Sequence, residues 1–132
     1  MKLQDVLTGV NYHLLKGSID IEINDIKFDS RKVTDGDIYV ALVGYNSDGH
    51  DYIKDAIKNG ATVIVTSKII AENNVTVIKV DDTRVSLSYM SANYFAHPER
   101  DLTLITLTGT AGKTTTTHMI SAILNHAGLK IL

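Results

Sequence analysis

The segment that most restricts the fold lies near the C-terminal end, where an apolar run leads into a glycine-containing loop. The run spans residues 102–107, and the loop and its continuation read Thr108-Gly109-Thr110-Ala111-Gly112-Lys113-Thr114-Thr115. The pattern predicts a strand over 102–107, a loop over 108–112 and a helix over 113–127, which Gly128 ends. We expect residues 129–132 to begin a further strand. A strand, a glycine loop and a helix in this order are typical of a phosphate-binding loop.

Each residue type in this loop suits phosphate chemistry. Glycines let the backbone turn tightly, so that successive N–H groups can face a phosphate. The first turn of the helix adds unpaired N–H donors and the positive end of its dipole. Lys113 supplies a mobile positive charge for the β- and γ-phosphates, and Thr114 supplies a hydroxyl for Mg²⁺. The competing interpretation, glycines that only permit a turn, does not account for the Gly-Lys-Thr sequence at the start of a helix.

The rest of the chain alternates between helical and extended patterns. We expect helices over 3–15, 51–59 and from Asp82 or Thr83 to about 96, with extended segments over 19–28, 38–43, 61–66 and 75–80. This alternation predicts an α/β architecture. Pro98 is the only proline and lies in a candidate boundary at 97–101. We therefore expect one domain over 1–98 and the start of a second over 99–132.

Composition excludes several classes of protein. Thirteen basic against fifteen acidic residues give a net charge of −2, whereas a nucleic-acid-binding module normally has a basic surplus. There are no cysteines, so disulfides and thiolate zinc ligands are excluded. No apolar run approaches membrane-spanning length. We expect a cytoplasmic protein that binds neither nucleic acid nor membrane.

Two sets of motifs together resemble the Mur ligases. The first is the TGTxGKTT pattern of the loop. The second is upstream and reads Asp29-Ser30-Arg31-Lys32-Val33, then Gly36-Asp37, then Gly44, then Asp48-Gly49-His50-Asp51-Tyr52-Ile53. This upstream region is similar to the N-terminal domain of the MurE type, the UDP-N-acetylmuramoyl-tripeptide synthetases. The resemblance covers nearly the whole chain. It implies a small N-terminal domain with a mixed sheet and flanking helices, followed by the first strand, loop and helix of a P-loop ATPase domain.

The resemblance also implies a reaction and a set of binding residues. Such ligases use ATP and Mg²⁺ to convert a carboxylate of UDP-N-acetylmuramoyl-dipeptide to an acyl phosphate, which the amino group of a third amino acid, diaminopimelate or lysine, attacks. Matched by position, the residues that contact the UDP-sugar are Phe28, Ser30, Tyr45, Asn46 and Ser47. The matching ATP-binding residues are Gly109, Thr110, Ala111, Gly112, Lys113, Thr114 and Thr115, with Thr114 also the metal-binding residue. Ala111 departs from the polar residue usual in the family, which leaves the backbone donors in place.

Alternatives from the residues themselves stay open. Ser30 and Arg31 could donate to a phosphate, or Asp29 and Ser30 could close a local turn. A MurF-type ligase, which adds the terminal dipeptide, and a nucleotide-binding module without chemistry are competing functions. A folylpolyglutamate synthase shares the loop and lacks the upstream motifs. With a single strand of the ATPase domain, we expect this chain to be a fragment that is inactive alone and contains no catalytic residues. Its unpaired last strand and helix are expected to pack on the first domain, to self-associate with another copy or to be poorly ordered.

Overall fold

The computed structural model describes residues 1–72 and 74–131, and it divides into two compact units, Met1–Pro98 and Glu99–Leu132. The first unit holds one five-stranded sheet in the order β1-β5-β4-β3-β2. The strands are β1 (Tyr12–Lys16), β2 (Ile26–Lys27), β3 (Ile38–Val40), β4 (Val63–Thr66) and β5 (Thr76–Val80). Strands β2 to β5 run parallel, and β1 pairs antiparallel with β5. The predicted mixed sheet is confirmed.

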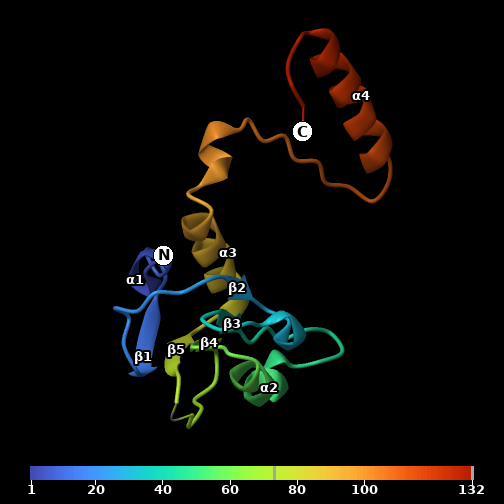
Figure 1. Ribbon diagram of the computed structural model, residues 1–132. Coiled ribbons are helices and arrows are strands. Elements are labelled where there is room, and N and C mark those ends of the chain that lie inside the picture. The colour runs from blue at the N-terminus through green and yellow to red at the C-terminus, as the bar shows by residue number, and fades with distance from the viewer. Residues whose placement is uncertain (73, 132) are drawn as a thin grey trace. The chain divides into compact units, whose positions relative to one another are not determined.

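Helices cover both faces of this sheet, as Figure 1 shows. They are α1 (Leu3–Val6), α2 (Ile53–Lys58) and α3 (Thr83–Tyr94). The short 3₁₀ helices are η1 (Ser30–Lys32), η2 (Gly49–Tyr52), which leads directly into α2, and η3 (Pro98–Asp101), which follows α3. Side chains alternate between the faces along each strand. Ile38 and Val40 belong to a core cluster with α1 and α3, whereas Tyr39 belongs to a second cluster with α2. Both faces are therefore buried, which explains why the central strands are continuous apolar runs.

The N-terminal segment differs from the predicted helix over 3–15. Only Leu3–Val6 is α-helical, and the chain is extended from Tyr12. Gly9 adopts φ 74°, a conformation that ends helical structure. Beyond it, hydrogen bonding to β5 outweighs the helical spacing of the apolar residues. The predicted extended segment 19–28 is likewise mostly irregular, because residues 19–23 bond to the first residues of the chain, as in Leu3 N–H to Ile21 O at 2.9 Å.

The second unit contains α4 (Lys113–His126) and no strand within its described residues, 99–131. The predicted strand over 102–107 was wrong for this chain. A strand needs a neighbour for its backbone hydrogen bonds, and every described ladder joins strands of the first unit. The predicted final strand is not formed at 129–131, and residue 132 lies outside the described residues. The apolar face of α4 is also not a core, since Met119 and Ile123 are exposed.

No helix among the described residues is long and apolar enough to cross a membrane.

Candidate functional site

The first unit has a cleft of about 800 Å³ beside the parallel part of the sheet. It lies where the chain leaves β2 and β3, at the carboxyl ends of these strands, which is where α/β sheets commonly bind ligands. The C-terminal end of α2 and the first turn of α3 complete it. The lining residues are Phe28, Asp29, Ser30, Arg31, Tyr39, Leu42, Gly44, Ser47, Gly49, Tyr52, Asp55, Lys58, Asn59 and Arg84.

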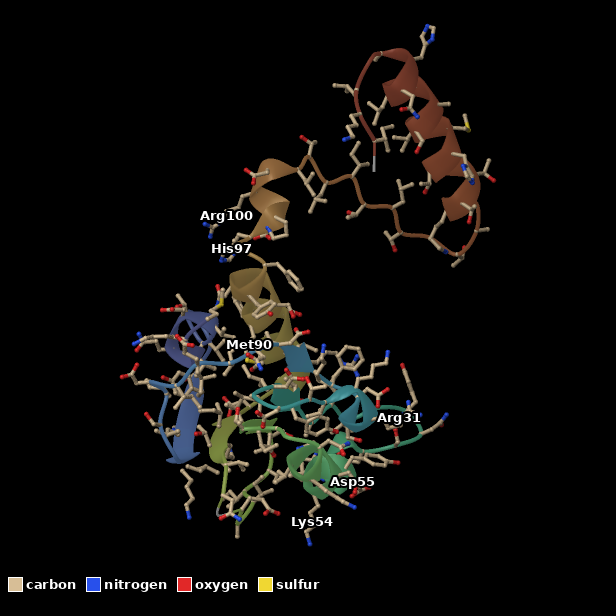
Figure 2. All side chains as sticks on the ribbon, in the orientation of Figure 1. Arg31, Lys54, Asp55, Met90, His97 and Arg100 are labelled. Carbon is tan, nitrogen blue, oxygen red and sulfur yellow. The ribbon has the colours of Figure 1, made fainter. Side chains whose placement is uncertain are left out.

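The wall after β2 is shaped by Asp29. Its carboxylate accepts the backbone N–H of Arg31 at 3.1 Å and so caps η1. It also accepts two hydrogen bonds from the Arg31 guanidinium, at 2.9 and 2.8 Å. The Arg31 side chain, labelled in Figure 2, thereby lowers the pKa of Asp29 to about 2. Asn59 donates from Nδ2 to the Ser30 carbonyl at 2.9 Å. The turn interpretation of Asp29 is therefore correct, and Ser30 remains among the residues that line the cleft.

The residues predicted to contact a UDP-sugar are not all in one place. Phe28, Ser30 and Ser47 line the cleft, with the Phe28 side chain 63% exposed and Ser30 buried. Tyr45 is fully exposed and lines a neighbouring hollow of about 390 Å³ with Val43, Gly44 and Arg84. Asn46 is exposed and lines neither hollow. The structure thus brings three of the five residues to the cleft and a fourth to its neighbour.

The loop that carries Tyr45, Asn46 and Ser47 is closed by its own backbone. Gly44 N–H donates to Ser47 O at 2.9 Å, and Gly49 N–H donates to Leu42 O at 2.8 Å. The close contact between the backbones of Gly49 and Leu42 requires glycine at position 49. A Cβ there would lie 2.7 Å from both the backbone nitrogen and the carbonyl oxygen of Leu42. The Tyr39 hydroxyl donates to Gly49 O at 2.9 Å. Burial raises the pKa of this hydroxyl to about 12, which keeps it a donor.

A polar cluster of Asp48, His50, Ser67 and Lys68 fastens this loop to the end of β4. Asp48 accepts from the His50 backbone N–H at 3.0 Å and from Lys68 Nζ at 2.6 Å, and it lies 2.5 Å from His50 Nδ1. Ser67 N–H donates to His50 Nε2 at 3.3 Å, so this nitrogen is the acceptor and Nδ1 carries the proton to Asp48. Lys68 and the His50 N–H together hold the pKa of Asp48 well below its usual range.

Sequence reasoning missed several residues of the cleft, namely Tyr39, Leu42, Tyr52, Asp55, Lys58, Asn59 and Arg84. Most of them lie on elements whose sequence patterns indicate only core or helix. Arg84 stands in the first turn of α3, where the helix dipole disfavours a basic residue. This unfavourable position of a positive charge is the one sequence feature that could have identified Arg84 as a candidate binding residue.

At the predicted phosphate loop of the second unit, the first backbone N–H groups of α4 have no side-chain cap. Gly112 precedes α4 with φ 76°, in the left-handed region that favours glycine. The Lys113 ammonium folds back and donates to the Gly109 carbonyl. Residues 109–115 are all exposed. Among the described residues, with 73 and 132 left aside, no group of three or more His, Asp or Glu side chains could hold a metal.

A family model agrees with this arrangement. The model described as "Mur ligase family, catalytic domain" matches residues 22–99, which contain every residue of the cleft. The chain belongs to the Mur ligase family. Two of the solved structures similar to this Mur ligase chain are MurF proteins. Crystal structure I of MurF from Acinetobacter baumannii has a TM-score of 0.73 and 31% identity over 95% of this chain and 27% of that one. MurF ligase from Thermotoga maritima in complex with ADP has a TM-score of 0.59 and 27% identity over 78% of this chain and 23% of that one.

Curated relatives of this Mur ligase chain carry a different name. UDP-N-acetylmuramoyl-L-alanyl-D-glutamate–2,6-diaminopimelate ligase of Clostridium tetani is 44% identical over 99% of this chain and 28% of its own length. The ligase of the same name from Fusobacterium nucleatum is 42% identical over 91% of this chain and 25% of its own length. The resemblance to the MurE type is confirmed. The chain spans about a quarter of the length of the curated relatives that it matches.

Proposed function

We propose that this chain is the substrate-binding beginning of an ATP-dependent Mur ligase that adds diaminopimelate to UDP-N-acetylmuramoyl-L-alanyl-D-glutamate in peptidoglycan synthesis. The observation that carries the proposal is the cleft at the ends of β2 and β3, which places Phe28, Ser30 and Ser47 around one hollow inside the family match. Relatives that are 44% and 42% identical to this chain, over 28% and 25% of their own length, carry the name of that ligase. The cytoplasm, where ATP is available, is the proposed location.

The cleft suits the nucleotide end of such a substrate. Phe28 and Tyr52 offer exposed aromatic faces, on which a pyrimidine base can stack. Lys58 and Arg84 offer positive charge to a diphosphate. The proposed UDP-sugar-binding residues are Phe28, Ser30, Tyr45, Asn46 and Ser47. Because Tyr45 and Asn46 lie on the loop outside the main cleft, we expect them to contact the sugar or the diphosphate more than the base.

Residues 109–115 are the proposed ATP-binding loop. The start of α4 has no side-chain cap, so its first N–H groups are available to a phosphate. Lys113 would exchange the Gly109 carbonyl for a phosphate oxygen. Thr114 offers one hydroxyl, and phosphate oxygens of ATP would supply further ligands for Mg²⁺, which takes oxygen donors in this way. The residues present therefore fit a metal held together with its nucleotide.

Calorimetric titration tests the proposal. We expect this chain to bind UDP-N-acetylmuramoyl-L-alanyl-D-glutamate at the cleft without needing ATP–Mg²⁺. We also expect no turnover by the chain alone, since it spans 28% of the length of its relatives. Absence of binding would contradict the proposed substrate site, and turnover of ATP and the dipeptide substrate would contradict the proposal that further domains are required.

The MurF type is the second candidate, because the similar solved structures include MurF proteins, with a TM-score of up to 0.73. The two candidates are distinguished by the amine that the complete ligase accepts. We expect product with 2,6-diaminopimelate, whereas product only with D-alanyl-D-alanine would establish the MurF type.

A further inference from the structure

One cation beside the cleft is held in an unusual way. Arg84 stands in the first turn of α3, and its Nη2 donates to the Val43 carbonyl at 3.1 Å. Val43 begins the loop that carries Tyr45 and Ser47. Arg84 and Gly44 line both the cleft and the neighbouring hollow. The guanidinium therefore sits where the two hollows adjoin, and one of its own hydrogen bonds keeps it there.

The charge of Arg84 is not balanced by a protein carboxylate. Among the ion pairs of residues 1–72 and 74–131, none includes Arg84, whereas Arg31 in the same cleft is paired with Asp29 at 2.8 Å. The nearby Asp82 carboxylate is engaged with backbone, accepting the N–H groups of Arg84 and Val85 at 2.8 and 3.0 Å. A guanidinium has five N–H donors, and the Val43 carbonyl accepts from one nitrogen. Arg84 thus presents a positive charge of fixed orientation, and the N–H groups that do not bond the Val43 carbonyl can bond a ligand.

We propose that Arg84 is a specificity-determining residue that recognises the diphosphate of a nucleoside diphosphate-linked substrate and holds the 43–48 loop against it. This inference rests on the proposed function. Guanidinium groups bind phosphate oxygens through two parallel hydrogen bonds, with defined direction as well as charge. The Val43 contact fixes the orientation of the group before the ligand arrives. The same side chain then links the loop, the start of α3 and the ligand.

The test separates phosphate recognition from support of the loop by comparing UDP with uridine, which lacks the phosphates. All titrations use the chain with Lys113→Ala, so that the phosphate loop contributes little to UDP binding. Arg84→Ala should weaken UDP binding about 10- to 100-fold, as loss of a charged hydrogen bond implies. Uridine binding should change less than about 3-fold. The UDP affinity of the Arg84→Lys variant should lie between those of the chain with Arg84 and the Arg84→Ala variant. Lysine keeps the positive charge but cannot form the two parallel hydrogen bonds of a guanidinium.

Lys54→Ala is the matched control. Lys54 is an exposed cation on α2 that lines neither hollow, and Figure 2 shows it pointing away from the sheet. Its removal lowers the net charge equally and should leave both affinities unchanged. Thermal unfolding of each variant checks that the first unit remains folded.

Each outcome is decisive. If Arg84→Ala weakens the binding of UDP and leaves the binding of uridine unchanged, the inference is supported. Equal losses for UDP and uridine overturn it while leaving the proposed function intact, because Arg84 would then act only through the loop. Equal UDP binding by the Arg84→Ala and Lys54→Ala variants also overturns it. Absence of UDP and uridine binding before Arg84 is changed contradicts the proposed substrate site itself, and the inference falls with it.

Discussion

At the scale of single residues, Asp48 is the side chain on which the cleft loop most depends. One carboxylate serves the His50 backbone, the His50 ring and the Lys68 ammonium, at 3.0, 2.5 and 2.6 Å. His50 in turn accepts from Ser67 at the end of β4. The position of Tyr45, Asn46 and Ser47 thus depends on a residue that contacts no ligand in the proposed function.

The depressed pKa of Asp48 gives this role a pH dependence. A carboxyl whose folded pKa lies below its unfolded value stabilises the fold above the unfolded pKa, about 3.9. That contribution is lost as pH falls through the folded pKa. Asp48→Asn should therefore lower the free energy of unfolding by about 1–2 kcal/mol at pH 7 and by much less near pH 2. Urea denaturation at the two pH values measures the difference.

Asp51→Asn is the control for this prediction, since Asp51 is exposed and belongs to none of the ion pairs among the described residues. Its effect should be small at both pH values. A destabilisation by Asp48→Asn that is equally large near pH 2 would mean that the carboxylate charge is not what holds the loop.

Part of the candidate site could be predicted from sequence because its residues stand in recognisable motifs. Ser30 and Ser47 flank loops that the family resemblance identifies, and both line the cleft. Lys58, Asn59 and Arg84 come from helix ends far away in the sequence, and only the folding of the sheet brings them to the same hollow. Periodicity describes which face of an element is buried, and it carries no information about which loops that face will meet.

At the scale of elements, α3 shows a cap whose value can be measured. Asp82 accepts the N–H groups of Arg84 and Val85 at 2.8 and 3.0 Å, which satisfies donors that the helix cannot satisfy itself. Asp82→Ala should lower the free energy of unfolding by about 1 kcal/mol. Asp81→Ala, a change to an exposed neighbour of the same type, should have little effect in the same denaturation experiment. Equal effects would assign the loss to charge and not to the cap.

The same scale shows where prediction of the fold succeeded and failed. Strands β3 and β4 are buried on both faces and β5 nearly so, and their largely apolar sequences predicted them. Residues 102–107 form an equally apolar run, and yet no strand forms there. The difference is a partner, because β4 has neighbours on both sides, whereas the described part of the second unit supplies no second strand. An apolar run thus indicates that a segment can form a strand. The strand forms only where a neighbouring strand is present to accept and donate its backbone hydrogen bonds.

At the scale of the whole molecule, the two units differ in how completely they bury their apolar residues. Both core clusters consist of residues from the first unit, and none comes from beyond Tyr94. A chain of residues 1–98 should therefore fold alone and unfold within about 5 °C of the full chain, since a change of 1 kcal/mol shifts the midpoint by a comparable amount. Calorimetric scans of the two chains provide the comparison. A much lower midpoint for 1–98 would show that residues 99–132 stabilise the first unit.

The second unit exposes apolar side chains in a way that favours association. Leu104, Ile105, Met119 and Ile123 are each at least 55% exposed. Exposed apolar side chains favour association, because burial against a partner removes them from water. We expect the full chain to associate as its concentration rises, whereas residues 1–98 remain monomeric, as measured by light scattering. A monomeric full chain at high concentration would contradict this expectation.

The antiparallel strand at the sheet edge has a consequence for synthesis of the protein. β1 forms its ladder only with β5, and Tyr12 pairs with Val80. At translation speeds of about 5–20 residues per second, β1 leaves the ribosome roughly 3–12 s before its partner. Throughout that interval Leu14 and Leu15 belong to an unpaired nascent segment. The parallel strands can begin to assemble as they emerge, but this sheet closes only when its earliest strand meets its latest.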